Sequence, residues 1–276
     1  MKRPILVIQL RPEDAAANSE FGAILRYGGL REDEVVRARV ERTGLPGIEL
    51  GDYASIIVGG SPFDVSTPDN AKSAIQKRIE SDFMALFERI VAVDFPFLGA
   101  CSGNGLLGKY CGAHISTKYA EPVGGADIKL TEEGKRDPLL EGFPGSFRVL
   151  LGHKEACDDI PPGAVLLAFS AACPVQMFRL RNNIYATQFH PEGDPDGFVV
   201  RINAYRRHGY FPPETADKLV AAVANEDTPV PQRILARFVR RYHGEPVSRS
   251  AHRGNRRARL DDPSDRSGMN SYSRRS

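Results

Sequence analysis

The sequence predicts an α/β fold in which an open, mainly parallel sheet is flanked by helices. Short β-rich runs alternate with stretches of helical periodicity through the first half of the chain, and the run at 53–60 ends in two glycines. The 276 residues, 41% of them apolar, can fill a sizeable core, and no internal repeat or linker interrupts the pattern. We therefore predict one folded domain over residues 1–246.

The first half of the chain supplies most of the predicted layers. Strands are expected at residues 5–10, 35–40, 53–60 and 95–100. Helices are expected around 20–30, over 71–94 and from about Gly103. The helix over 71–94 is predicted because six apolar residues recur on one face, namely Ile75, Ile79, Phe83, Leu86, Phe87 and Ile90.

The second half has β-rich runs that follow one another more closely, which indicates an antiparallel extension of the sheet. These runs lie at 126–130, 147–152, 164–170, 174–180 and 183–189. Two added helices are expected to close the fold, at 195–210 and 213–242.

The last thirty residues differ in composition from the rest. From Val247 onward they hold eight arginines and three aspartates, whereas the whole chain has a formal net charge of only +2. Such a segment, rich in Ser, Arg and Gly, cannot bury enough apolar surface to offset its ordering entropy, so we predict a disordered basic tail over 247–276. Weak attraction to a polyanion is one interpretation. No folded RNA-binding signature accompanies the arginines, and we do not expect a nucleic-acid partner.

Composition also argues against several classes of protein. No window approaches the roughly 18 uninterrupted apolar residues that a membrane span needs, and the first apolar run continues into polar residues rather than a signal-peptide cleavage site. The four cysteines, at positions 101, 111, 157 and 173, show neither disulfide nor zinc-site spacing. We expect a cytoplasmic protein with no membrane association, no metal site and no cofactor.

Cys101 stands where a predicted strand gives way to a predicted helix, with Gly99 and Gly103 on either side. A sharp turn of this kind presents a nucleophile at the sheet edge, and a helix N-terminus favours the thiolate. The amide of Ser102 would then point toward an attacked carbonyl. Free cysteines more often act as small buried hydrophobes, so this stretch alone leaves both interpretations open.

A second motif favours the nucleophile. His190 and Glu192, separated by a proline, follow the predicted strand at 183–189, and open α/β sheets gather their active-site groups at the carboxyl ends of strands. A thiol nucleophile needs a base, and the imidazole needs an acceptor that orients it. Cys101, His190 and Glu192 can fill these three roles, whereas a metal site would lack a third ligand at a recognisable spacing.

With these motifs the chain resembles the class I, triad-type glutamine amidotransferases, over roughly residues 5–207. IIVGGSP at 56–62 is similar to the family's oxyanion loop, PFLGACSGNGLLGKYCGA at 96–113 to its nucleophile elbow, and YATQFHPE at 185–192 to its histidine–glutamate motif. Within the family, the chain resembles stand-alone, GMP-synthase-like amidotransferase domains. The resemblance implies a flavodoxin-like fold with a central parallel sheet.

The resemblance also implies a reaction. Cys101 would attack the side-chain amide of glutamine, a γ-glutamyl thioester would form, and water would release glutamate while ammonia passes to an acceptor. His190 would activate the thiol and protonate the ammonia, and Glu192 would orient His190. The oxyanion would be held by Ser102 and by the loop Gly59, Gly60 and Ser61, where we expect Gly60 to supply the second amide, and His153 would line the substrate pocket.

Three departures from the family pattern matter. Gly105 stands where the family usually has a substrate-contacting glutamine, the oxyanion loop is one residue longer, and no ATP-binding phosphate loop is present. Glutamine hydrolysis therefore implies a separate synthase partner that accepts the ammonia. Two alternatives remain: a hydrolase of γ-glutamyl conjugates that uses the same three residues, and a catalytically silent regulatory or binding subunit.

Overall fold

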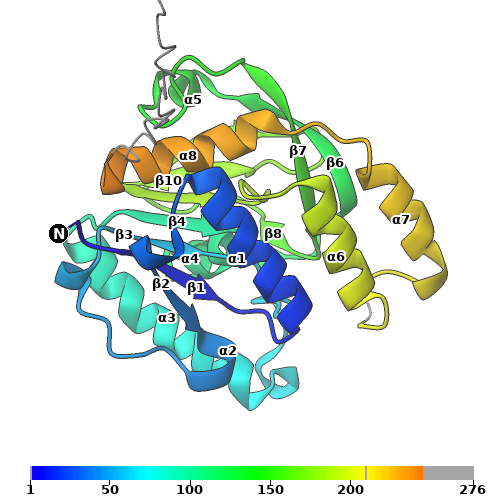
Figure 1. Ribbon diagram of the computed structural model, residues 1–276, viewed down its shortest axis with the longest axis horizontal. Coiled ribbons are helices and arrows are strands. Elements are labelled where there is room, and N and C mark those ends of the chain that lie inside the picture. The colour runs from blue at the N-terminus through cyan, green and yellow to red at the C-terminus, as the bar shows by residue number, and fades with distance from the viewer. Residues whose placement is uncertain (1, 209, 245–276) are drawn as a thin grey trace, which may run out of the picture. The chain divides into compact units, whose positions relative to one another are not determined.

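The computed structural model describes residues 2–208 and 210–244, and its main feature is a nine-stranded sheet in the order β2-β1-β3-β4-β11-β10-β9-β6-β7 (Figure 1). The strands of this sheet are β1 (Ile5–Gln9), β2 (Val35–Arg39), β3 (Ser55–Val58), β4 (Phe97–Ala100), β6 (Glu121–Leu130), β7 (Ser146–His153), β9 (Ala164–Phe169), β10 (Met177–Leu180) and β11 (Ile184–Thr187). A small second sheet pairs β5 (Ile115–Ser116) with β8 (Ala156–Cys157).

The sheet has a parallel half and an antiparallel half. Strands β2, β1, β3, β4 and β11 run parallel to one another. From β11 through β10, β9 and β6 to β7 every pairing is antiparallel. The α/β fold class is therefore confirmed, and the antiparallel extension predicted for the second half of the chain is present.

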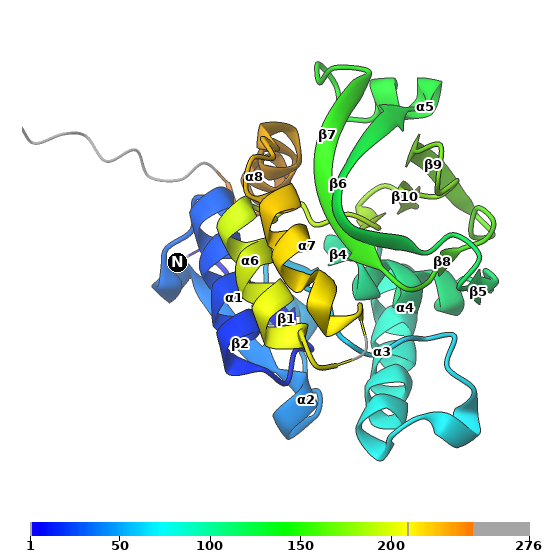
Figure 2. The ribbon, with the colours of Figure 1, turned by 90° about the vertical axis from the view of Figure 1, so that its right-hand side faces the viewer.

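Helices cover both faces of the parallel half. On one side lie α1 (Asp14–Gly28) and α8 (Pro229–His243), and on the other lie α2 (Val40–Thr43), α3 (Ala74–Ala92) and α4 (Ser102–Tyr110) (Figure 2). Helix α6 (Pro195–Tyr205) packs against α1, and α7 (Ala216–Val223) packs against α6 and the antiparallel strand β6. Helix α5 (Glu132–Arg136) lies apart from both groups, against β9.

Strand β1 shows how the sequence builds these layers. Successive side chains of a strand point to opposite faces, so Ile5 and Val7 join the cluster beneath α1 and α8, while Leu6 and Ile8 join the cluster beneath α3. All four are fully buried. A continuous apolar run is therefore what a strand needs when both faces of the sheet are covered.

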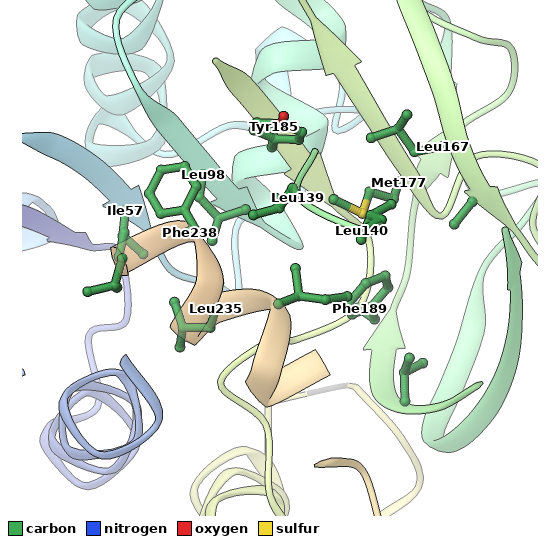
Figure 3. Packing of buried hydrophobic residues seen from close by; sticks show 14 of the residues in the cluster. Ile57, Leu98, Leu139, Leu140, Leu167, Met177, Tyr185, Phe189, Leu235 and Phe238 are labelled. Carbon is green, nitrogen blue, oxygen red and sulfur yellow. The ribbon is translucent and has the colours of Figure 1, made fainter. Parts of the chain in front are cut away.

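Helix α8 is held by the first of these clusters. Leu235 and Phe238 of α8 lie against the sheet near Ile57 and Leu98 (Figure 3), and the Phe238 ring meets Tyr185 edge-on with 6.5 Å between centroids. The C-terminal helix thereby contributes to the core of the sheet whose strand ends carry the candidate site.

The structure corrects some local predictions. Ile75 is 43% exposed instead of buried, and it lies in the first turn of α3, which begins at Ala74. The span 213–242 forms two helices, since the polar run at 225–228 and a proline that begins α8 interrupt it. Four short elements were not predicted from the sequence: α2, α5, β5 and β8.

Two predictions concern the ends and the environment of the chain. The basic tail predicted over 247–276 lies outside the described residues. Among the helices of residues 2–208 and 210–244, none has the length and apolar character that crossing a membrane would require.

The contrast between Phe87 and Ile75 on α3 can be tested by unfolding. Phe87 is fully buried and contacts the rings of Phe83, Phe97 and Tyr110. We expect Phe87→Ala to lower the free energy of unfolding by about 3–5 kcal/mol, because it leaves a cavity in the core. Urea denaturation gives this value, and Ile75→Ala is the control, expected to change it by less than about 0.5 kcal/mol. Equal losses for the two variants would contradict the buried position of Phe87 and the exposed position of Ile75.

Candidate active site

Cys101 occupies a strained turn between β4 and α4. Its backbone has φ +52° and ψ −94°, a conformation that residues other than glycine rarely adopt, and its amide donates to the carbonyl of Thr187 on β11 at 2.8 Å. A Cβ added to Gly99 would lie 2.8 Å and 2.9 Å from the carbonyl carbon and oxygen of Gly103, so only glycine lets the helix start so close to the strand. The strand-to-helix elbow predicted at Cys101 is therefore present.

The start of α4 offers free amides next to the thiol. Within residues 2–208 and 210–244, the amides of Ser102 and Gly103 donate to no protein acceptor, as expected for the first turn of a helix. The Ser102 hydroxyl lies 2.8 Å from the Ser61 hydroxyl, and Tyr210 donates to the Ser61 carbonyl at 3.0 Å. The glycine loop is thus fixed to the elbow.

A buried carboxylate lies beneath this loop. Glu20 of α1 is fully buried, and its Oε2 accepts hydrogen bonds from Arg11 Nε at 2.7 Å and from the Gly60 amide at 3.2 Å. A Cβ at Gly59 would clash with the Glu20 carboxylate, and a Cβ at Gly60 would clash with the Arg11 guanidinium and lie 2.8 Å from Cε1 of His190. The two glycines therefore leave room for a buried ion pair next to the imidazole.

This hydrogen bond corrects our expectation for the loop. The Gly60 amide is already donated to Glu20, so it is not free to hold an oxyanion. The Ser61 amide has no acceptor among the described residues, which makes it the available donor of the loop.

His190 follows β11 and is held by Glu192. His190 Nδ1 lies 2.8 Å from Glu192 Oε1, and Arg201 of α6 donates to the same oxygen through Nη2 at 2.7 Å. All three side chains are more than nine-tenths buried. The imidazole is thereby oriented with its Nε2 edge left to face a reacting group.

Burial sets the resting protonation states of the thiol and the imidazole. Burial raises the pKa of the Cys101 thiol to about 12, although Arg11 and Arg201 act in the opposite direction. Burial also lowers the pKa of His190, against the attraction of Glu192. Both shifts favour a neutral thiol and a neutral imidazole in the resting site.

Glu192 stays ionised in this setting. Burial would raise the pKa of its carboxyl, but His190 and Arg201 outweigh burial and hold this pKa well below its ordinary range. The carboxylate can therefore keep the imidazole in one orientation and stabilise it when it gains a proton.

His153, predicted as a pocket residue, is engaged with protein groups. Its Nε2 lies 3.0 Å from Glu121 Oε2, and its Nδ1 lies 3.0 Å from the Glu155 carbonyl. Potential metal-ligating atoms of Glu121, His153 and Cys173 lie within 4.8 Å of one another, as do those of Glu20, His190 and Glu192. In both groups the carboxylates already accept hydrogen bonds from protein donors, so these atoms stabilise the fold as they stand.

Two hollows meet at Cys101. The first, which we call the His190 hollow, is lined by Cys101, His190, Arg11, Arg201, Ser61, Gly152 and a set of apolar and aromatic residues. The second, which we call the Glu155 hollow, is lined by Cys101, Ser102, Gly105, Ser61, Phe63, Asp64, Gly152, His153, Lys154, Glu155, Gln188 and Tyr210. The Cys101 thiol is therefore accessible from two sides. The His190 hollow brings the imidazole to it, and the Glu155 hollow brings the free amide of Ser102.

Glu155 occupies the space around Gly105. A Cβ at Gly105 would lie 3.4 Å from Glu155 Oε1, so a longer side chain there would contact this carboxylate. Both Glu155 oxygens accept backbone amides, of Val65 and Ser66, at 2.7 Å. Burial raises the pKa of the Glu155 carboxyl above its ordinary value. Gly105, which differs from the glutamine expected at this position, therefore lies in the same hollow as the carboxyl group of Glu155.

Sequence reasoning missed Arg11, Glu20 and Arg201. Arg11 follows the carboxyl end of β1. Active-site groups gather at the carboxyl ends of such strands, so Arg11 could have been predicted in the same way as His190. Glu20 is a charge on the apolar face of α1, between Ala17 and Ile24, which is a recognisable signal of a buried polar group. Arg201 contacts Glu192 from nine residues further along, and no local pattern indicates that contact.

Several known proteins are similar to this chain. A family model described as Glutamine amidotransferase class-I matches residues 22–202. The glutamine-hydrolyzing GMP synthase of Caldicellulosiruptor saccharolyticus is 27% identical over 179 residues, which are 63% of this chain and 33% of that protein. A glutamine-hydrolyzing GMP synthase subunit of Pyrococcus abyssi is 27% identical over 169 residues, which are 61% of this chain and 79% of that protein. The match thus spans about a third of the length of the first of these relatives.

A solved structure supports the fold. A glutamine amidotransferase from Thermotoga maritima superposes with a TM-score of 0.71 at 18% identity, covering 89% of this chain and 100% of that chain. This likeness confirms the central sheet with flanking helices, and at this level of identity it bears on the fold alone.

We expect the Cys101 thiol to be alkylated slowly at neutral pH. Because the pKa of Cys101 is raised to about 12, the rate constant for iodoacetamide should increase about tenfold per pH unit between pH 7 and pH 10. Mass spectrometry of the peptide that contains Cys101 measures this rate, and the peptide of Cys111, whose pKa burial raises to about 11, serves as an internal comparison. A plateau near pH 7 would show that a thiolate is already formed.

We expect replacement of Arg201 to shift the pH dependence of turnover. Arg201 is one of the charges that lower the pKa of His190, so Arg201→Met should raise that pKa and move the acidic limb of kcat/KM to higher pH. The measurement is a pH–rate profile together with the thermal midpoint. Arg201→Lys keeps the positive charge and should stay close to the unsubstituted protein, whereas a uniform loss at all pH values in both variants would indicate a purely structural role.

Proposed function

This chain belongs to the class I glutamine amidotransferases, and from that premise we propose that it hydrolyses the side-chain amide of glutamine through a γ-glutamyl thioester on Cys101. The observation that carries the proposal is the placement of Cys101 on a strained elbow, at a hollow that it shares with His190, while Glu192 holds the other edge of the imidazole. These are the nucleophile, base and orienting group that thiol hydrolysis of an amide requires.

The first half of the reaction forms the thioester. His190 removes the thiol proton as the Cys101 sulfur attacks the amide carbon, and the amides of Ser102 and Ser61 stabilise the negative oxygen. Each such donor contributes roughly 3 to 4 kcal/mol in other enzymes. His190 then delivers its proton to the nitrogen, the carbon–nitrogen bond breaks and ammonia leaves. In the second half, water activated by His190 hydrolyses the thioester to glutamate and restores the thiol.

The Glu155 hollow suits the glutamyl part of the substrate. The α-carbon of glutamine carries an ammonium and a carboxylate, and this hollow holds Glu155 and Asp64 together with Lys154. Ser102 lies in the same hollow, so a carbonyl that enters from this side meets the free amide of the elbow. His153 would act here by fixing Glu155 through its hydrogen bond to the Glu155 carbonyl.

We propose a separate acceptor of the ammonia. The Pyrococcus abyssi relative is, by its name, one component of a larger synthase, and this chain matches it over 79% of that relative's length. The four cysteines of the chain are unpaired, as is usual for proteins of a reducing compartment, which supports a cytoplasmic location.

Hydrolysis of γ-glutamyl conjugates is the second candidate. Two observations favour it: Gly105 in place of the family's glutamine, and a hollow on the His190 side that ammonia would not fill. The reaction steps are unchanged, with an amine leaving in place of ammonia.

Ammonia and glutamate release from glutamine tests the proposal. We expect release from the full chain, a loss of at least a thousandfold in Cys101→Ala, and little change in Cys111→Ala. Because a partner could be needed for turnover, the second measurement is labelling by a glutamine analogue that carries a diazoketone in place of the amide. Mass added at Cys101 supports the proposal, whereas no turnover and no label on the folded protein would favour the silent regulatory or binding subunit.

A further inference from the structure

We propose that the His190 hollow binds the amine half of the substrate, and that this amine is an amino acid with an apolar side chain, so that the chain cleaves γ-glutamyl amides of apolar amino acids. The inference rests on the second candidate of the proposed function, hydrolysis of γ-glutamyl conjugates, and keeps the γ-glutamyl thioester on Cys101. It adds the identity of the amine that leaves in place of ammonia.

The side on which the amine lies follows from the chemistry of the imidazole. The group that protonates the departing nitrogen must contact that nitrogen, so any substituent on it extends toward His190. His190 lines the hollow named after it and does not line the Glu155 hollow. The glutamyl half and the amine half are therefore assigned to opposite sides of Cys101.

The lining of the His190 hollow suits an apolar substituent. The hollow has a cavity volume of about 40 Å³ and opens to solvent. A molecule the size of water or ammonia needs less than this. Six apolar or aromatic side chains line it: Val123, Phe198, Ile202, Tyr205, Tyr210 and Phe211. An amine with an aliphatic or aromatic side chain would bury that side chain here.

Arg11 adds a requirement for a carboxylate. Its side chain is 5% exposed, with Nε on Glu20 and Nη1 on the Tyr205 hydroxyl at 3.3 Å, whereas Nη2 donates to no acceptor in the described part of the chain. That nitrogen lies against Gly60, next to His190 Cε1. A guanidinium with one donor left over beside the imidazole fits a carboxylate one carbon away from the departing nitrogen, as in an amino acid.

Arg201 is a second arginine in the lining of the His190 hollow. Its Nη2 binds Glu192, while its Nε and Nη1 are buried without a hydrogen-bond partner among the described residues. Positive charge thus faces the hollow from Arg11 and Arg201, and the neighbouring carboxylates of Glu20 and Glu192 are already engaged by these arginines. The two ion pairs balance in charge, so the group that the hollow offers to a carboxylate on the amine is the spare Nη2 donor of Arg11.

The reaction balances without a further reactant. The sulfur–carbon bond forms on Cys101 as the carbon–nitrogen bond breaks, and the thiol proton reaches the amine nitrogen through His190. Water then hydrolyses the thioester, which yields glutamate and the free amino acid.

A substrate panel on the full chain tests the inference. Glutamate release is measured for glutamine, γ-glutamylphenylalanine, γ-glutamylglycine and the γ-glutamyl amide of phenethylamine, which has the aromatic ring and lacks the carboxylate. We expect kcat/KM for γ-glutamylphenylalanine to exceed that of each of the other three compounds at least tenfold. In Arg11→Met the ratio of the phenylalanine to the phenethylamine compound should fall toward one.

The ratio is the readout because Arg11 also holds Glu20, so Arg11→Met lowers the rate for every substrate. Both compounds are measured on the same variant and share the same thioester, which cancels any loss from folding or from hydrolysis of the thioester. Arg89→Met, at an exposed arginine paired with Glu49, is the control and should keep the ratio of the unsubstituted chain.

Failure of the inference and failure of the proposed function have different signatures. Efficient cleavage of glutamine together with poor cleavage of γ-glutamylphenylalanine overturns the inference and leaves the proposed function standing, with the hollow then serving as the exit of ammonia. A ratio near one in the unsubstituted chain also overturns the inference. If no compound is cleaved, calorimetric binding to Cys101→Ala decides, and equal affinity for the phenylalanine and phenethylamine compounds overturns it.

Discussion

The candidate site depends on one buried carboxylate, that of Glu20. Glu20 lies on α1, yet it accepts hydrogen bonds from Gln9 at the end of β1, from Arg11 just beyond it and from the Gly60 amide after β3, and it lies 3.9 Å from Arg201 on α6. An isolated buried charge would be strongly destabilising. Here two arginines and two carboxylates, Glu20 and Glu192, balance one another, so the cost of burial is offset by mutual pairing, and the loop, the strand end and the helix are fixed together.

This balance explains the protonation states at rest. With the charges of the arginines already matched by carboxylates, burial prevails at Cys101 and raises the pKa of its thiol, and it prevails at His190 and lowers the pKa of its imidazole. Thiol and imidazole are therefore both neutral until a carbonyl is close enough to accept the sulfur. In such a site the transfer of the thiol proton to His190 accompanies the attack of the sulfur.

Features that depend on residues close together in the sequence could be predicted, whereas contacts between distant segments could not. The strands around β1 and β4, the elbow at Cys101 and the His190–Glu192 motif are encoded by neighbouring residues, and local patterns predict them. The break between α7 and α8 was missed because its polar run is short and amphipathic helices lie on both sides. The contacts of Glu20 with Gly60 and of Arg201 with Glu192 are tertiary. The sequence alone therefore could not show that the Gly60 amide is hydrogen-bonded to Glu20.

The two halves of the sheet have different tasks at the site. Ends of the parallel strands β3, β4 and β11 carry the glycine loop, Cys101 and His190, so the parallel half positions the reacting groups. The antiparallel strands β6 and β7 supply Val123 and Gly152 to the hollows, and Lys154 and Glu155 follow β7 directly. The side chain of His190 is oriented by Glu192, and its backbone amide donates to the carbonyl of Leu150 on β7 at 3.1 Å. The antiparallel half therefore both lines the hollows and helps to hold the imidazole, so the choice of substrate and the chemistry performed on it share one framework.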